Sequence, residues 1–142
     1  MTISLKMFHQ ACKKGDIDSV KSFLCTKSEA IDIPSKDGWT GLIIACYEEH
    51  IEVVRLLIEM GANVNAVNRK GTTVFMYAKT PVQNKHKDTS LLTYLLKCGA
   101  EINKKDAFGK TVLDYVIENE DLYLANWLKS NGAKTNKLNK LL

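Results

Sequence analysis

The residues that most often carry catalysis are scattered along this chain instead of standing at the spacings that chemistry requires. The histidines His9, His50 and His86 are far apart, and none belongs to an HExxH motif, a metal-binding Asp/His pair or the nucleophile elbow of a serine hydrolase. Solitary histidines are more simply explained by structure, so we expect His50 to begin a helix and His86 to lie in a solvated loop. The pattern predicts no metal site and no nucleophilic catalysis.

Carboxylates and glycines lead to the same expectation. Five acidic residues fall where helices are expected to end in water, which is an ordinary place for them, so none is predicted to form an acid/base pair. The eight glycines stand singly, without a GxGxxG or P-loop pattern that would hold a phosphate. We therefore expect neither an enzyme nor a cofactor site. The acidic residues are Glu48, Glu49, Glu118, Glu120 and Asp121.

Composition favours one soluble domain spanning residues 1–142. Hydrophobic residues make up 45% of the chain and charged residues 25%, as in ordinary globular proteins. Apolar runs stay far below the roughly 20 residues that cross a bilayer, and the first residues lack the apolar core of a signal peptide. We expect a cytoplasmic protein without membrane contact. The four cysteines show no zinc-binding spacing and are expected to be reduced thiols: Cys12, Cys25, Cys46 and Cys98.

Cations recur around successive predicted turns. The formal charge of +4 is too small to imply nucleic-acid binding, and no Arg-rich helix or base-reading motif is present. The charge favours a partner with an acidic surface. Two interpretations of the cationic edge stay open, namely a solubilising edge and a recognition edge. Its residues are Lys36, Arg69, Lys70, Lys104, Lys105 and Lys110.

The spacing of three independent markers reveals an internal repeat of 33 to 38 residues. Gly-Ala pairs, turn glycines followed two residues later by threonine, and closing asparagines all recur at the same intervals. We place the repeats at about 4–36, 37–69, 70–106 and 107–139, the first being degenerate. The markers are the pairs at Gly61, Gly99 and Gly132, the glycines Gly38, Gly71 and Gly109, and the asparagines Asn65, Asn103 and Asn136.

Each repeat is predicted to form a turn followed by two helices. Glycine permits the turn, threonine accepts a hydrogen bond from the first turn of helix one, and Asp or His begins helix two. Apolar residues at helical spacing follow, and a glycine ends the second helix. The predicted caps are Thr40, Thr73 and Thr111 for the first helices, and Asp16, His50, Asp88 and Asp121 for the second.

The third repeat is five residues longer than its neighbours between Ala78 and Gly99. Pro81 cannot continue a helix interior and disfavours the α conformation of Thr80, so we expect the first helix to stop there. The segment from Lys79 to Ser90 is then an exposed, mobile loop. It is either tolerated length or a second contact site.

The segment DGWTGLIIACYEEHIEVVRLLIEMGANVNAVN, residues 37–68, resembles the ankyrin repeat through its DGxTxLxxA opening and GAxVNA close. This resemblance covers nearly the whole chain and implies an all-α solenoid of stacked helix-turn-helix units with β-turn or hairpin tips. The last unit resembles the capping version of the repeat, and the tail is expected to fold back over it through Leu138, Leu141 and Leu142. The usual proline is replaced by Gly41, Val74 and Val112 and the usual histidine by Ile43, Met76 and Asp114, which predicts weaker hydrogen bonding between repeats.

The resemblance implies a protein-protein interaction module that is monomeric when free and binds its partner on the concave surface of tips and first helices. Alternatively, the chain is a specific inhibitor, such as an immunity or effector protein that blocks one enzyme or toxin. Trp39 is either a binding anchor or a residue packed against its neighbouring turn. The positions carried over are Lys36, Asp37, Trp39, Tyr47, Glu48, Arg69, Lys70, Thr72, Lys79, Thr80, Phe108 and Lys110.

Overall fold

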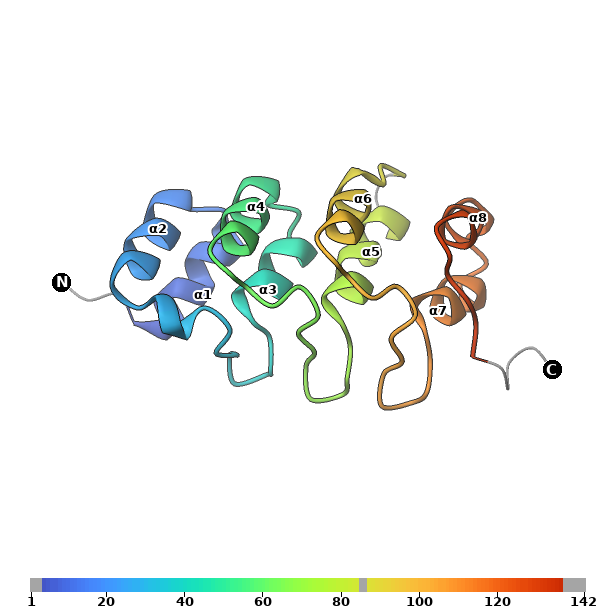
Figure 1. The fold of residues 1–142 in the computed structure, drawn as a ribbon, viewed down its shortest axis with the longest axis horizontal. Helices are drawn as coiled ribbons and strands as arrows, with labels where there is room; N and C mark the ends of the chain where they lie inside the picture. Colours follow the sequence, from blue (N-terminus) through green and yellow to red (C-terminus); the bar gives the residue numbers. More distant parts are fainter. Residues whose placement is uncertain (1–3, 85–86, 137–142) are drawn as a thin grey trace.

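The computed structural model describes residues 4–84 and 87–136, in which eight α-helices form four successive pairs (Figure 1). Within this part of the chain there is no extended strand, only an isolated bridge between Val67 and Thr73. The predicted all-α repeat fold is therefore confirmed. The helices are α1 (Leu5–Lys14), α2 (Ile17–Thr26), α3 (Gly41–Tyr47), α4 (Ile51–Glu59), α5 (Val74–Asn84), α6 (Ser90–Lys97), α7 (Val112–Glu118) and α8 (Leu122–Ser130), with a 3-10 turn at Ser28–Ala30.

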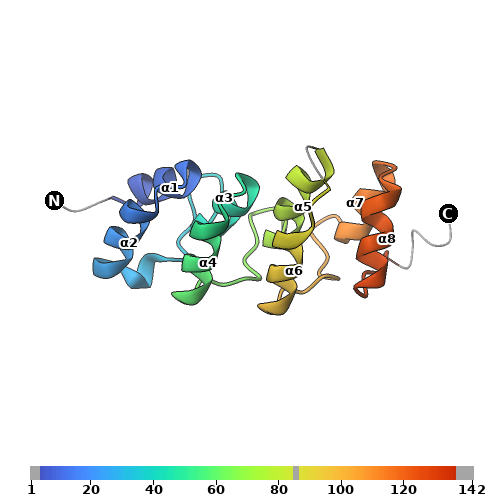
Figure 2. The same cartoon turned by 90° about the horizontal axis from the view of Figure 1, so that it is seen from above.

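The helix pairs stack because a single pair cannot bury both of its apolar faces. The first helices α1, α3, α5 and α7 follow one another along the array, and the second helices α2, α4, α6 and α8 form a parallel row beside them (Figure 2). Leu57, Leu95 and Leu128 occupy corresponding places in α4, α6 and α8 and are fully enclosed. One apolar core therefore runs from the first pair to the last.

Three hairpin tips project from the same side of the stack (Figure 1). We define them as residues 35–39, 68–72 and 106–110. Gly38, Gly71 and Gly109 have positive φ angles of 85°, 75° and 75°, as the turn prediction requires. In each tip the first residue donates its backbone N–H to the carbonyl of the last, from Ser35 to Trp39 (2.9 Å), Asn68 to Thr72 (3.0 Å) and Asp106 to Lys110 (3.0 Å).

Side-chain caps begin the first helices as predicted. The hydroxyl oxygens of Thr40, Thr73 and Thr111 accept backbone hydrogen bonds at 3.2, 3.0 and 3.3 Å from the residues three positions later. Thr111 and Asp114 form a reciprocal capping box at α7.

The second helices begin at three of the four predicted N-cap residues, Asp16, His50 and Asp121. Asp16 and Asp121 accept bonds from backbone N–H groups at 3.2 and 3.0 Å. His50 precedes α4 but makes no side-chain cap; its Nε2 lies 2.8 Å from the carbonyl oxygen of Lys13 and links the first two units instead. α6 begins at Ser90, one residue later than predicted, and Asp88 accepts from the amide of Ser90 (2.9 Å).

The closing asparagines tie successive units together. Asn65 donates to the carbonyl of Gly99 (3.0 Å) and accepts from the amide of Glu101 (2.8 Å). Asn103 makes the same pair of bonds one unit later, to Gly132 (3.0 Å) and Lys134 (2.7 Å). These bonds join repeats that lack the usual histidine at the first helix.

The prediction for Pro81 is wrong. α5 continues through Pro81 to Asn84, so four of the extra residues lengthen this helix. The proline removes one amide donor, yet Pro81 and Val82 are both buried, and their burial offsets the lost hydrogen bond. Residues 79–84 are therefore helix and not an exposed loop.

Residues 87–89 directly precede α6 and are not helical. Lys87 contacts the last unit through the Asp121 carboxylate at 3.5 Å and the Tyr123 ring at 5.4 Å. The expected positions of His86 and of the tail leucines Leu138, Leu141 and Leu142 lie outside the described residues.

Candidate protein-binding surface

A groove of about 690 Å³ opens between the first two units, on the surface formed by the tips and by α1, α3, α5 and α7. We call this the tip-side surface. α1 forms one wall, the first tip forms the end, and α3 forms the other wall. The lining residues are Leu5, Lys6, His9, Gln10, Lys13, Pro34, Ser35, Lys36, Asp37, Trp39, Ile44, Tyr47 and Glu48.

Trp39 is held by aromatic neighbours from two units. Its ring centroid lies 5.5 Å from that of Tyr47, edge on, and 4.5 Å from that of Tyr77 in α5. The Tyr77 hydroxyl accepts a hydrogen bond from the Asn68 side chain (2.7 Å), and burial raises the pKa of Tyr77. Trp39 is partly buried, so it packs against the next unit while the same ring lines the groove.

His9 forms a polar part of the groove floor. It is 8% exposed, and its Nε2 lies 3.0 Å from the carbonyl oxygen of Ile33, in the segment that leads to the first tip. Burial lowers the pKa of His9, against a smaller opposing effect of that carbonyl. The neutral imidazole is favoured and fixes α1 to the chain entering the first tip.

Charged side chains surround the apolar floor. Lys6, Lys13 and Lys36 are exposed cations that line the groove, and Asp37 and Glu48 are exposed anions. Within the described residues none of these three lysines takes part in an ion pair.

The second tip continues the surface with a different composition. Arg69 and Lys70 are exposed, and Thr72 is partly buried. The Asn68 side chain accepts from the amides of Lys70 and Thr72, both at 2.9 Å, which fixes the turn. The Lys70 carbonyl accepts from the amide of Ala107 (2.9 Å), so the second and third tips are joined through their backbones.

Two of the predicted contact residues on α5 are less accessible than expected. Lys79 is 9% exposed; its ammonium group donates to Gln83 (3.2 Å) and lies 5.8 Å from the centre of the Tyr115 ring. Burial lowers the pKa of Lys79. Thr80 is partly buried and donates its hydroxyl to the Met76 carbonyl (3.3 Å). The prolonged α5 explains both, because its last turn encloses residues that a loop would have exposed.

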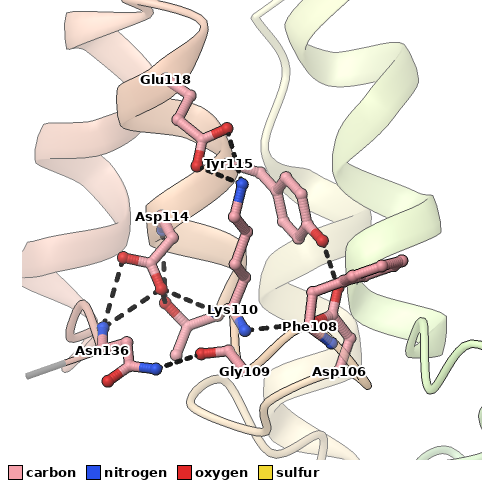
Figure 3. A network of polar contacts seen from close by, with 9 residues as sticks. Asp106, Phe108, Gly109, Lys110, Asp114, Tyr115, Glu118 and Asn136 are labelled. Carbon is pink, nitrogen blue, oxygen red and sulfur yellow. Dashed lines mark hydrogen bonds and ion pairs between the residues drawn. The ribbon is translucent and has the colours of Figure 1, made fainter. Parts of the chain in front are cut away.

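The polar side chains of the third tip contact other residues of the last unit (Figure 3). Lys110 approaches both carboxylate oxygens of Glu118, at 2.7 and 3.0 Å, and its ammonium group lies 5.1 Å from the centre of the Tyr115 ring. The Tyr115 hydroxyl donates to Asp106. Phe108 at the apex is 67% exposed and, unlike Trp39, makes no aromatic ring contact with another described residue.

The same network has a buried side. Asp114 accepts from the amides of Thr111 (2.9 Å) and Asn136 (3.1 Å), and the Asn136 side chain donates to the Gly109 carbonyl (Figure 3). Asp114 thus replaces the usual histidine of the repeat with a carboxylate that binds the following segment. All of these bonds lie within the last unit and join no second repeat to it.

The α1 wall of the groove was absent from the sequence prediction. An offset of 34 residues, already visible in Ala11 and Ala45, places Leu5 at the position of Trp39 and Lys13 at that of Tyr47. Applying this offset to the contact positions would have found both residues. The sequence prediction assigns no contact residue to the degenerate first repeat.

The cysteines remain thiols. Cys12 and Cys46 are buried, and burial raises the pKa of both, to about 12 for Cys12. Cys25 is exposed and Cys98 partly buried. Among residues 4–84 and 87–136 no group of three His, Cys, Asp or Glu side chains is placed to hold a metal ion, and no helix is long and apolar enough to cross a membrane.

The fold and the tip-side surface define a helical repeat protein of the kind that binds other proteins. A family model described as ankyrin repeats (3 copies) matches residues 8–106, and the chain belongs to the ankyrin repeat family. Members of this family are protein-protein interaction modules on a non-catalytic scaffold.

Relatives carry these repeats inside longer proteins. The E3 ubiquitin-protein ligase KEG of Arabidopsis thaliana is 30% identical over 125 residues, covering 88% of this chain and 8% of that protein. The ankyrin repeat and LEM domain-containing protein 1 homolog of Caenorhabditis elegans is 30% identical over 109 residues, covering 77% and 15%. The ankyrin repeat and SAM domain-containing protein 6 of Rattus norvegicus is 28% identical and covers 92% and 14%. The chain thus spans less than a sixth of the length of these relatives.

Proposed function

We propose that this chain binds a partner protein through its tip-side surface, with the main contact at the first two units. The observation that carries the proposal is the groove between α1 and α3. All five contact residues assigned to the first tip and α3 from the sequence line this one groove: Lys36, Asp37, Trp39, Tyr47 and Glu48.

Aromatic side chains support a protein partner. Tyr47 is 38% exposed although it belongs to the aromatic cluster with Trp39 and Tyr77. Partly exposed aromatic residues held rigidly by neighbours are typical of the centres of protein interfaces, because they bury a large area at little cost in conformational entropy.

Site-specific photo-crosslinking tests this proposal. Benzoylphenylalanine is introduced in place of Tyr47, and in a matched variant in place of Tyr123, an exposed tyrosine on α8. Both variants are irradiated in lysate of the source organism. We expect a crosslinked protein at position 47 and none at position 123. Partners trapped only at position 123 would show that the tip-side surface is not the binding surface.

We also propose that the protein is cytoplasmic and non-catalytic. When free it is monomeric, and it favours a partner with an acidic surface. The formal charge of +4 supports the monomeric state because it disfavours self-association, and it supports an acidic partner because it attracts anionic surfaces. Light scattering during size-exclusion chromatography measures the oligomeric state, and a mass near 15.9 kDa is the expected result.

A further inference from the structure

The groove combines an apolar floor with a cationic rim, and this combination indicates the chemistry of the ligand that it would bind. Leu5, Trp39 and Ile44 contribute apolar surface from α1, the first tip and α3. Such a floor takes up an apolar side chain, because burial removes hydrocarbon from water on both partners.

The rim is asymmetric. Lys6 and Lys13 lie seven residues apart on α1, and therefore on one face of that helix, with Gln10 between them. Lys36 adds a third cation at the first tip. The anions Asp37 and Glu48 belong to the tip and to the end of α3. The charged residues of the α1 wall are therefore cations only, Lys6 and Lys13.

Cations also continue past the groove. Arg69 and Lys70 at the second tip are both exposed, and this tip projects beside the first (Figure 1). A ligand that used them together with the groove would be longer than the groove itself. A volume of about 690 Å³ is in the range of roughly 300–1,000 Å³ that accommodates small ligands, so it takes a few side chains and not a folded domain.

These observations point to one occupant. Resting on the proposed function, we infer that the groove binds a short segment of the partner in which an apolar anchor residue is flanked by aspartate or glutamate. The anchor fills the space beside Trp39 and Ile44, and the acidic side chains meet the α1 lysines and Lys36. A second copy of this chain is a poor occupant, because its net charge of +4 repels the same rim.

The test is selection from a library of random 12-residue peptides displayed on phage, using the full chain as bait. The enriched peptides are synthesised, and their affinities are measured by fluorescence anisotropy. We expect sequences with one large apolar residue beside at least two acidic residues. Affinity is expected to fall as salt is raised, because exposed charge pairs are screened. Enriched peptides without acidic residues would overturn the inference.

Two charge-matched variants locate the binding. The groove variant carries Lys6→Glu, Lys13→Glu and Lys36→Glu; the control carries Lys14→Glu, Lys21→Glu and Lys129→Glu, which are exposed and lie outside the groove lining. Thermal melting confirms that both are folded. We expect at least about tenfold weaker binding to the groove variant and a change within about twofold for the control.

The remaining outcomes separate the inference from the proposed function. Equal losses in the two variants would mean attraction by net charge, which overturns the inference. Peptides without acidic residues that still lose affinity on Tyr47→Ala would also overturn it while leaving the tip-side surface as the binding site. Native mass spectrometry of the purified chain covers other occupants: a small molecule or a dimer present in wild type and lost in the groove variant contradicts the inference.

Discussion

The first and third tips are built on the same repeat, yet their side chains are used in opposite ways. Trp39 and Lys110 occupy corresponding positions, as do Tyr47 and Glu118. At the first tip these positions hold aromatic rings that line an open groove. At the third tip they hold Lys110 and Glu118, whose charged groups pair with each other at 2.7 Å. The surface near α1 is thus the one we propose for a partner, whereas the charged groups near α7 pair within their own unit.

The comparison also shows where the scaffold ends and the surface begins. The enclosed core leucines, the tip glycines and the threonine caps are the same in both regions. Positions that face away from the stack are free to differ, since stacking makes no demand on them. Substitutions of surface residues should therefore have different effects at the two ends, whereas substitutions of core residues should have similar effects.

Core truncation gives the largest expected effect. Leu57→Ala and Leu128→Ala each remove a fully enclosed side chain at corresponding positions of α4 and α8. We expect each to lower the free energy of unfolding by roughly 2–5 kcal/mol, because the cavity is only partly filled by relaxation. Urea denaturation measures this, with Leu122→Ala, at a side chain 76% exposed, as the control. An unchanged midpoint for Leu57→Ala would mean that the helical register is wrong.

The anchor at the first tip comes next. Trp39→Ala should weaken partner binding by about 2 kcal/mol or more, as for a central aromatic anchor. The contact with Tyr77 at 4.5 Å adds a loss of stability, so binding is measured at a temperature where the melting curve shows a fully folded variant. Tyr123→Ala is the exposed aromatic control. Unchanged affinity in a folded Trp39→Ala variant removes Trp39 from the site.

Two tip glycines test the packing between tips. Gly71 and Gly109 share a φ of 75°, so alanine strains both backbones by roughly 1–2 kcal/mol. A Cβ at Gly71 would lie 2.9 Å from the backbone nitrogen of Ala107, whereas at Gly109 the nearest atom is the Asn136 side-chain nitrogen at 3.3 Å. We expect Gly71→Ala to be the more destabilising in thermal melts. Equal losses would show that the second and third tips separate readily.

The smallest effect concerns the closed network at the third tip. Burial raises the pKa of Tyr115, and the hydrogen bond with Asp106 raises it further. A raised pKa favours the protonated phenol in the folded state, so its contribution is complete below about pH 10 and is lost as pH rises above it. Tyr115→Phe should therefore reduce the loss of stability as the pH rises above about 10, whereas Tyr123→Phe should not. Identical pH profiles for wild type and Tyr115→Phe would contradict this role for the network.

Local signals made the scaffold predictable. A turn with positive φ needs glycine, and a helix start needs an oxygen acceptor, so Gly38 and Thr40 reveal their roles without tertiary information. The prediction at Pro81 failed because the cost of proline within a helix is local, whereas the burial that offsets it depends on tertiary packing. His50 begins α4 as predicted, but its ring contacts the end of α1 and does not cap the helix with its side chain.

The groove that we propose as the binding surface was predictable only in part. The contact residues of the first tip and α3 follow from the repeat register, and all of them line the groove. The α1 wall required the register to be extended through a degenerate first unit. The burial of Lys79 could not be predicted because Pro81 indicated a short first helix, whereas α5 continues to Asn84.

The two tryptophans provide the most direct test of the contrast between the two ends. Trp127→Phe leaves Trp39 as the single reporter at the groove, and Trp39→Phe leaves Trp127 as the reporter on α8. Each variant is titrated with the partner protein that photo-crosslinking identifies, produced in a tryptophan-free form. Tryptophan emission and its quenching by acrylamide are recorded. We expect the emission of Trp39 to shift and its quenching to fall on binding, with Trp127 unchanged. A response from Trp127 alone would place the partner at the closed end of the array and contradict the proposed binding site.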